Sequence, residues 1–349
     1  MKSFLFLALL LICFKLSADT PYELPRSSVI ELEEKSSGRI YPLFIQLPPS
    51  YTANTDQTYP VIYLTDAHYS FPIVSGAMRF PMNSGVMQHA IIVAVSAPAI
   101  ILKTIDGGAS WNKVYENADT SMFLDALHFS DENNGTVIGD PIDGHLFILT
   151  TNNKGASWIK MPNAYFKSDL NNGEAFFASS NSNLIHIGKE LVFVTGGLSS
   201  RLWKNGVAEA LPLLQGTSST GANSIAISPN GNRIIIVGGD FANDKLATNN
   251  IVGFKLFQTP NSEFKHLAKK QLVWEQLSLA NPNGYKSCVE FIDNNQLITC
   301  GTSGVDLSKD KGTSWEKISD LSFHIAKKHP TKKGAYLAGS GGRISFVEL

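Results

Sequence analysis

The chain has 349 residues, of which 17% are charged, 10% are aromatic and 28 are glycines. This length exceeds that of a typical single domain, but turn-rich all-β domains often reach it as one unit. The 29 basic and 30 acidic residues nearly cancel, to a net charge of −1. Because a nucleic-acid-binding surface needs a basic patch or stripe, this balance gives no indication of a nucleic-acid partner.

The first 18 residues have the pattern of a secretory signal peptide. Lys2 precedes an apolar run from Phe4 to Cys13, and Leu16-Ser17-Ala18 precedes a plausible cleavage point. The apolar run is shorter than the ~20 residues that a membrane-spanning helix needs. We therefore predict a signal peptide over residues 1–18, a periplasmic or secreted location, and no membrane span after cleavage.

Residues 19–99 differ in character from the rest of the chain. Strand-like runs such as Tyr59–Ala67 and Ala90–Ser96 resemble the first strands of α/β-hydrolases of the esterase-D or siderophore-esterase type. That resemblance covers residues 28–97 and stops before the strand that would carry the nucleophile. Such a hydrolase needs a Ser on a Gly-x-Ser-x-Gly turn, and the chain contains no such string. We therefore expect a truncated α/β-hydrolase-like segment over residues 19–99.

From residue 100 onward one short pattern, Ser/Thr-x-Asp/Asn-x-Gly-x-x-Trp, occurs three times. The Asp or Asn oxygen can accept hydrogen bonds from backbone N–H groups of its own turn. The Gly allows a positive φ, and the Trp presents a large apolar face to a neighbouring sheet. The pattern therefore predicts tight turns between strands. Its residues are Thr104, Asp106, Gly108 and Trp111; Thr151, Asn153, Gly155 and Trp158; and Ser308, Asp310, Gly312 and Trp315.

These turns resemble the Asp boxes (BNR repeats) of sialidase-like β-propellers. Between them the chain repeats strand-like segments, as in Leu124–Phe129, Thr136–Gly139 and His145–Thr150, at intervals close to the ~40–50 residues of one propeller blade. Five such repeats follow a half-repeat at Ile91–Val114. We therefore predict an all-β domain over residues 100–349. It is a six-bladed or incomplete seven-bladed β-propeller, preceded by the small α/β-hydrolase-like fragment.

Six further strings share one feature, which is that each lies beside an expected strand of the repeat. They are Phe123–Leu127, Gly139–Gly144, Glu174–Ser179, Gly238–Phe241, Gly301–Gly304 and Gly339–Ile344. Together they resemble a family of exported bacterial propellers related to the photosystem II stability and assembly factor, whose members often carry an oxidoreductase label. The resemblance implies a non-catalytic protein-binding or assembly and stability factor, with a protein partner in the cell envelope.

Four acidic residues are expected near the central face of the propeller. Asp125, Asp140, Glu174 and Asp240 each lie in one of these strings, next to an expected inner strand. Side chains from inner strands and loops converge on the channel of a propeller, so these four are the candidate binding residues. The alternative is that each carboxylate stabilises its own turn by accepting backbone hydrogen bonds.

Two kinds of hydrolase are the alternatives to a binding protein. A sialidase-type glycosidase holds a carboxylate with three arginines, and the propeller region has Arg201, Arg233 and Arg343, each of which follows a turn. That placement favours structural or peripheral roles. An esterase would lack its nucleophile. The histidines show no metal-ligand spacing and no haem motif is present, so we assign no catalytic residue, no metal and no cofactor.

Two cysteines remain after signal cleavage, Cys288 and Cys300. A turn centred on Asn294 would place them directly opposite each other in a β-hairpin, where their Cβ atoms can lie close enough for a disulfide. An oxidising compartment permits that bond. The alternative is a pair of buried thiols that pack as small apolar groups.

The last repeat shows three strands where four are expected. We predict that an N-terminal strand, either Ser28–Glu33 or Tyr41–Leu47, completes this blade and closes the ring. Without such a strand the sheet edge stays open, and an open edge is prone to association.

Overall fold

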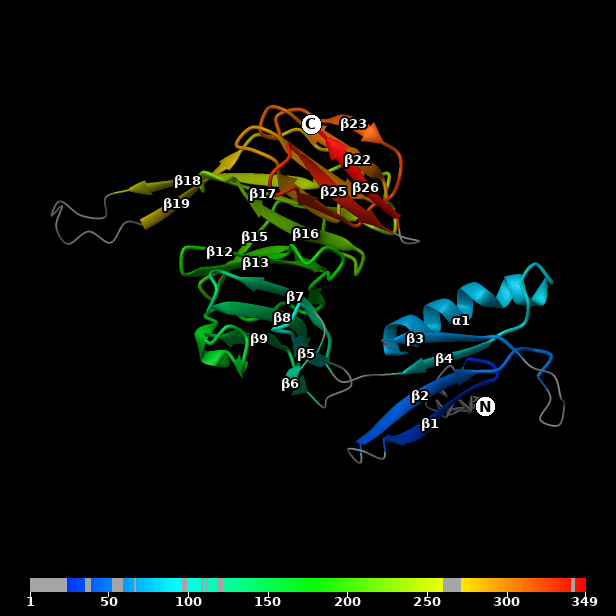
Figure 1. Cartoon of the computed structure of the whole chain (residues 1–349). Coiled ribbons are helices and arrows are strands. Elements are labelled where there is room, and N and C mark those ends of the chain that lie inside the picture. The colour runs from blue at the N-terminus through cyan, green and yellow to red at the C-terminus, as the bar shows by residue number, and fades with distance from the viewer. Residues whose placement is uncertain are drawn as a thin grey trace, which may run out of the picture. The chain divides into compact units, whose positions relative to one another are not determined.

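The computed structural model describes residues 24–34, 39–51, 59–65, 67–95, 99–107, 110, 112–117, 122–259, 271–339 and 343–349. The chain forms two compact units, Met1–Pro98 and Ala99–Leu349, which are drawn in Figure 1. The predicted signal peptide, residues 1–18, lies outside the described residues. Within the described part, no helix combines the length and the apolar character that crossing a membrane requires.

The first unit is a small α/β structure. Its elements are β1 (Ser27–Glu34), β2 (Arg39–Gln46), β3 (Val61–Thr65), α1 (Ala67–Asn83) and β4 (Ile91–Val95). The sheet order is β1-β2-β4-β3, with β3 and β4 parallel and joined through α1. The helix covers one face of the sheet, where Phe71 and Met82 pack with Ile92. An α/β unit was expected here, and its hydrolase-like character stays a prediction.

Both segments that were expected to close the propeller belong to this first sheet instead. β1 and β2 pair with each other, for example at Val29 and Phe44, and β2 also pairs with β4. The prediction that Ser28–Glu33 or Tyr41–Leu47 completes the last blade is therefore wrong. The physical reason is that a hairpin between neighbouring strands closes a much shorter loop, at lower entropic cost, than pairing with a distant blade.

In its described residues the second unit is almost entirely β-structure, with one 3-10 helix at Asn163–Tyr165. Its strands are β5 (Ala99–Lys103), β6 (Asn112–Asn117), β7 (Leu124–Phe129), β8 (Gly135–Ile142), β9 (His145–Thr151), β10 (Ile159–Lys160), β11 (Glu174–Ala175), β12 (Leu184–Ile187), β13 (Glu190–Gly197), β14 (Arg201–Lys204), β15 (Val207–Ala210), β16 (Thr220–Ile227), β17 (Arg233–Asp240), β18 (Ile251–Thr259), β19 (Gln271–Leu277), β20 (Cys288–Phe291), β21 (Leu297–Gly301), β22 (Gly304–Ser308), β23 (Glu316–Ser319), β24 (Ile325–Lys328), β25 (Gly334–Gly339) and β26 (Arg343–Glu348).

These strands form six antiparallel meanders that follow one another in chain order. The first is the hairpin β5–β6, the next four are the four-stranded β7–β10, β12–β15, β16–β19 and β20–β23, and the last is the three-stranded β24–β26. The second and third four-stranded meanders are bridged by one backbone pair, Gly196 with Gly221. Figure 1 shows the meanders as a curved row from β5–β6 to β24–β26.

Five hydrophobic cores join the six sheets in this row. Successive cores lie between β5–β6 and β7–β10, then between β7–β10 and β12–β15, and so on to the core between β20–β23 and β24–β26. Within the described residues, each inner sheet has a core on both faces, whereas β5–β6 and β24–β26 have one on a single face. This is the all-β propeller architecture that the repeats predict, in the form of an incomplete, open ring.

The Trp-containing turns have the hydrogen bonds that their pattern predicts. In each turn the Asp or Asn side chain accepts the backbone N–H of the residue four positions later, which holds the turn closed. The distances are 2.9 Å from Ser110 N to Asp106 Oδ1, 3.1 Å from Ser157 N to Asn153 Oδ1, and 2.8 Å from Ser314 N to Asp310 Oδ1.

The Gly and Trp of the second and third turns also do what the pattern predicts. Gly155 and Gly312 have φ angles of +72° and +89°. Trp158 packs edge-on against Phe129 in the core beside β5–β6, and Trp315 packs in the core between the sheets of β16–β19 and β20–β23. In the first turn, Gly108 and Trp111 lie outside the described residues.

Candidate partner-binding site

The first strand of each complete sheet lies beside the first strand of the next one, which fixes the inner side of the row. Hydrogen bonds that cross from sheet to sheet hold β7, β12, β16, β20 and β24 in place. They run from Leu127 N to Asn181 Oδ1 (2.7 Å), from Ile225 N to Ser182 O (2.7 Å), from Val289 N to Ser224 Oγ (3.0 Å) and from Ala326 N to Cys288 Sγ (3.3 Å).

Two of the four predicted acidic residues, Asp125 and Asp140, come together at the start of β7 and the end of β8. Asp125 occupies a bulge in its strand, where the register shifts between Leu124 and Ala126, and it is buried. Burial raises the pKa of Asp125 well above its ordinary value, and the nearby charge of Asp140 raises it further. Among the described residues, Asp125 Oδ2 has no hydrogen-bond partner. Asp125 is thus suited to hold a proton, not to attract a cation.

Glu174 is taken up by structural contacts. Its buried carboxylate forms an ion pair with Arg201 and accepts hydrogen bonds from Arg201 Nε at 3.0 and 2.9 Å and from Trp203 Nε1 at 3.0 Å. The hydroxyl of Thr195 also donates to it. Because these donors come from β13 and β14, Glu174 on β11 ties three strands together and has no capacity left for a ligand.

Asp240 stabilises its own turn, which is the alternative that the sequence left open. Its Oδ1 accepts the backbone N–H of Ala242 at 2.9 Å. The four predicted residues therefore do not converge on one site. Asp125 and Asp140 are brought together, whereas Glu174 and Asp240 each have separate structural partners.

The three arginines of the propeller also make separate contacts. Arg201 is paired with Glu174 as described, Arg233 Nη1 donates to the carbonyl of Lys311 at 3.3 Å, and Arg343 Nη1 donates to that of Ser322 at 2.9 Å. Each guanidinium is tied to the backbone or to a side chain of its own region. Their arrangement does not form a clamp for one carboxylate.

Cys288 and Cys300 lie directly opposite each other on β20 and β21, as the predicted hairpin register requires. Both are buried free thiols, so the disulfide that the sequence allowed is not formed. Cys288 Sγ hydrogen-bonds with the Cys300 thiol, accepts the N–H of Ala326 at 3.3 Å and lies 3.8 Å from Ser182 Oγ. The pair thus follows the alternative, in which two thiols pack as small apolar groups in the core next to β24.

A groove beside the last sheet of the propeller has a volume of about 620 Å³. It lies between β21–β23 on one side and β24–β26 on the other. Its size falls in the range of ligand-binding pockets. We call it the β26 groove, and its lining residues are Gln296, Val305, Leu307, Lys309, Glu316, Ile318, Ser319, Leu321, Phe323, Leu337 and Ser345–Leu349.

The floor of the β26 groove is apolar and its rim is mixed. Phe323 and Leu337 are buried at the bottom, and the more exposed Ile318 and Leu321 stand at the side. Lys309 and Glu316 carry the charges of the rim, with Nζ and Oε2 3.9 Å apart. An apolar floor with a few polar groups around it is typical of a surface that receives side chains of another molecule.

β26 forms one wall of this groove and is an edge strand. It pairs with β25 along its whole length, and within the described residues it has no partner on its other side. The four-stranded sheets each hold a fourth strand at the equivalent position, namely β10, β15, β19 and β23. The sequence indicated this open edge, because its last repeat shows three strands where four are expected.

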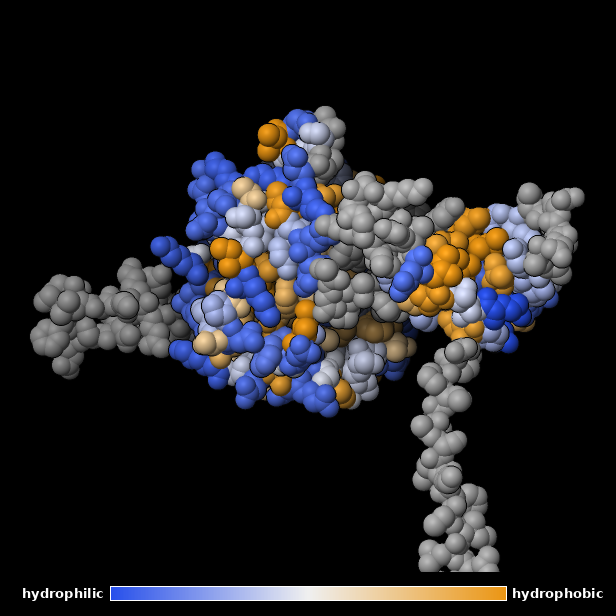
Figure 2. All heavy atoms as spheres, turned by 90° about the horizontal axis from the view of Figure 1, so that it is seen from below, coloured by the Kyte–Doolittle hydropathy of each residue, from blue (hydrophilic) through white to orange (hydrophobic). Residues whose placement is uncertain are grey.

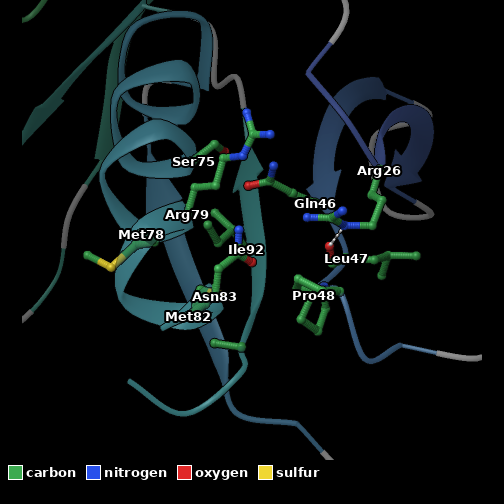
Figure 3. A pocket seen from close by; sticks show the side chains of 12 residues that line it. Arg26, Gln46, Leu47, Pro48, Ser75, Met78, Arg79, Met82, Asn83 and Ile92 are labelled. Carbon is green, nitrogen blue, oxygen red and sulfur yellow. Dashed lines mark hydrogen bonds between the residues drawn. The ribbon is translucent and has the colours of Figure 1, made fainter. Parts of the chain in front are cut away.

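A second hollow lies in the N-terminal unit, under α1 (Figure 3). Its volume is about 10 Å³, which is roughly the space of one water molecule. Arg26 Nε donates to the carbonyl of Leu47 at 3.2 Å across its rim. This hollow is too small for a substrate or a cofactor.

Sequence reasoning missed one cluster of titratable residues. His128 on β7 and His186 on β12 stack with ring centroids 5.1 Å apart, and Thr136 Oγ1 lies 3.2 Å from His186 Nε2. Within the described residues, no group of three or more His, Cys, Asp and Glu side chains is placed to hold a metal ion. No spacing along the chain could have shown that these two histidines meet, because they come from different sheets.

On the face shown in Figure 2, hydrophobic residues of the second unit are dispersed among hydrophilic ones. Dispersed apolar side chains are normal for a protein surface. The β26 groove is therefore the strongest candidate site, because it combines an apolar hollow with an unpaired strand edge.

No family model matches the chain, and no curated protein sequence matches it either. Solved structures similar to it include "YCF48 bound to D1 peptide", with 16% identity, 74% of each chain covered and a TM-score of 0.44. Another is the GH74 enzyme of Niastella koreensis, with 10% identity over 73% of this chain and 50% of the other, and a TM-score of 0.40. The BES protein from Bacillus cereus is similar over 27% of this chain and 34% of its own, with 23% identity and a TM-score of 0.20. Because all three TM-scores lie below 0.5, none of these likenesses transfers a function.

Proposed function

We propose that this protein is a non-catalytic binding factor that holds an extended segment of another polypeptide as a fourth strand along β26. The observation that carries this proposal is the position of an unpaired strand edge directly beside an apolar groove of about 620 Å³. An exposed edge offers a row of backbone N–H and C=O groups to a new strand. A partner bound in this way complements a sheet that has one strand fewer than its four-stranded neighbours.

Backbone and side chains would have separate roles in this binding. In strand addition the backbone hydrogen bonds supply affinity for any extended segment, and pockets for alternate side chains supply specificity. Successive side chains of a strand point to opposite faces, so every second residue of the partner would enter the β26 groove. The apolar side chains of Ile318, Leu321 and Phe323 favour Leu, Ile, Val or Phe at those positions.

The partner that we propose is an envelope protein met after export. This follows from the predicted signal peptide over residues 1–18, whose cleavage near Ala18 would be shown by the mass of the secreted chain. One of the similar solved structures is that of YCF48 bound to D1 peptide. Support for peptide binding here comes from this chain's own open edge, since that likeness is low.

The test is selection of peptides from a random dodecapeptide display library on the full chain, followed by hydrogen exchange. We expect selected peptides to be extended, with apolar residues at alternate positions, and to protect the amides of Arg343–Glu348. The variant Leu321→Glu should weaken such peptides by at least about tenfold, because it puts a charge into the groove. The control is Leu198→Glu, at a similarly exposed leucine outside the groove.

Two results would contradict the proposal. One is a set of selected peptides that leaves the exchange of β26 unchanged. The other is equal loss of binding in Leu321→Glu and in Leu198→Glu, which would show that the groove is not the place of contact.

A further inference from the structure

The open ring leaves two sheet faces without a neighbouring sheet. Six sheets in a row share five cores, so one face of β5–β6 and one face of β24–β26 remain uncovered within the described residues. We call them the first end face and the last end face. Both belong to the propeller unit. The β26 groove faces the sheet β20–β23, on the other side of the last sheet, and shares only Phe346 with the last end face among the residues named for the two surfaces.

The last end face carries large apolar side chains. Tyr336 on β25 lies directly opposite Phe346 on β26, and their rings are 5.2 Å apart. The ring of His329 joins them, at 5.4 and 5.6 Å. Tyr336, Ile344 and Phe346 have exposed fractions of 48%, 75% and 37%. The other face of the same strands holds Ala335 and Leu337, which are buried in the core against β20–β23.

The first end face has the same kind of alternation. In β5, Ala99 and Ile101 pack on the core shared with β7–β10. Ile100 and Leu102 point to the other side, with exposed fractions of 42% and 47%. Ile100 lies opposite Glu116 and Leu102 lies opposite Lys113, and these two charged residues form an ion pair of 2.6 Å. The first end face is thus an apolar stripe with a polar border.

The two end faces are complementary in kind. Each sheet has one face toward the following sheet in the chain and one face toward the preceding sheet. In each of the five cores, the forward face of one sheet packs on the backward face of the next. The last end face is the forward face of β24–β26, and the first end face is the backward face of β5–β6. Contact between them would therefore repeat an arrangement that the chain already makes five times.

We infer that the two end faces bind each other between copies of this chain, so that the last sheet of one copy packs on the hairpin β5–β6 of the next. Such a contact joins unlike surfaces, so it is head-to-tail and can add further copies. The terminal sheets of a repeat array need a polar outer face to stay separate. Each end face here instead exposes large apolar side chains beside its charged groups, which are Lys113 and Glu116 on the first end face and Lys332 over the Phe346 ring on the last. This association is independent of the proposed strand addition along β26.

The test uses sedimentation of the full chain over a range of concentrations, with one end blocked at a time. Ile344→Glu blocks the last end face and Leu102→Glu blocks the first. We expect the unmodified chain to associate progressively, and each variant to associate at least about tenfold more weakly, since a charge would be buried in the contact. The matched control is Ile159→Glu, at an exposed apolar residue on β10 away from both end faces, which should leave association unchanged.

A mixture of the two blocked variants gives the most specific outcome. Each variant keeps one functional end, so the mixture should form dimers of one copy of each and nothing larger. As a second measurement, a mixture of Ile344→Cys and Leu102→Cys chains should cross-link between copies on mild oxidation, whereas either variant alone should not.

Several outcomes would overturn the inference. The unmodified chain could stay monomeric at every concentration, it could associate equally well in both blocked variants, or the two cysteine variants could fail to cross-link. Failure of peptide binding in the groove would leave this inference untouched, because Leu321 and Ile318 lie on neither end face.

Discussion

His128 and His186 meet across two sheets, with their Nδ1 atoms 2.9 Å apart. Burial, together with the neighbouring His128 and against an opposing effect of Asp131, lowers the pKa of His186 to about 4. Burial also lowers the pKa of His128, with a contribution from Lys327 on β24. Since two cationic imidazoles at this distance would repel each other, the fold favours the neutral forms.

The first prediction concerns pH. Because the pKa of His186 is lower in the folded chain than its ordinary value of 6.5, its contribution to stability is complete above pH 6.5. It is lost as pH falls from 6.5 toward 4. Urea unfolding at pH 7.5 and at pH 4.5 should therefore show a smaller loss of stability in His186→Gln than in the unmodified chain. An equal loss in both proteins would contradict this assignment.

A second prediction concerns the buried pair of Glu174 and Arg201. Glu174→Gln leaves the guanidinium without its counter-charge in a buried site, and breaking such a pair costs about 3–5 kcal/mol. The free energy of unfolding in urea measures this loss. Glu132→Gln is the control, since its exposed ion pair with Lys154 should contribute at most ~1 kcal/mol. Equal losses in the two variants would show that the buried pair of Glu174 and Arg201 adds no more stability than an exposed ion pair.

A third prediction concerns close backbone packing at Gly238. A Cβ atom at this position would lie 1.8 Å from the carbonyl oxygen of Gly221 on the adjacent strand. Gly238→Ala should therefore destabilise the propeller by at least about 2 kcal/mol, because backbone must move. Gly76→Ala in α1, where a Cβ would meet nothing within 4 Å, should be neutral or stabilising. Thermal unfolding compares the two variants. If Gly238→Ala unfolds at the same temperature as the unmodified chain, the close approach of β17 to β16 at Gly238 and Gly221 is contradicted.

A fourth prediction concerns the two thiols. In a chain cleaved after Ala18, Cys288 and Cys300 are the remaining cysteines. Both are buried and free, so neither should react with a thiol reagent in the native state, and both should react after unfolding without reductant. An unfolded, unreduced chain with no reactive thiol would mean that the disulfide forms after all.

Local features of this fold follow from the sequence because turns and hairpins are encoded by neighbouring residues. Leu124–Phe129 was expected as a strand and is β7 with the same bounds. The pairing of Cys288 with Cys300 follows from the position of a single turn. In both cases the alternation of side chains and the turn residues specify strand and register without help from distant contacts.

The site depends on distant contacts, and these were harder to predict. Whether β26 stays an edge depends on where β1 and β2 pair, and they pair with each other. The role of Glu174 depends on donors from β13 and β14. The acidic residues were chosen for their place near inner strands, but burial and packing decide which carboxylates remain accessible, and no local pattern reports burial of that kind.

Hydrogen exchange of the isolated chain at low concentration tests the open edge of β26 most directly. About half of the backbone amides of residues 343–348 in β26 should exchange fast, since only one side of an antiparallel edge strand is hydrogen-bonded. Residues 297–301 of β21, which pair with β20 and β22, should be protected throughout. Uniform protection of β26 at the level of β21 would show that another strand already covers it, and would contradict the account of an open propeller with a strand-accepting edge.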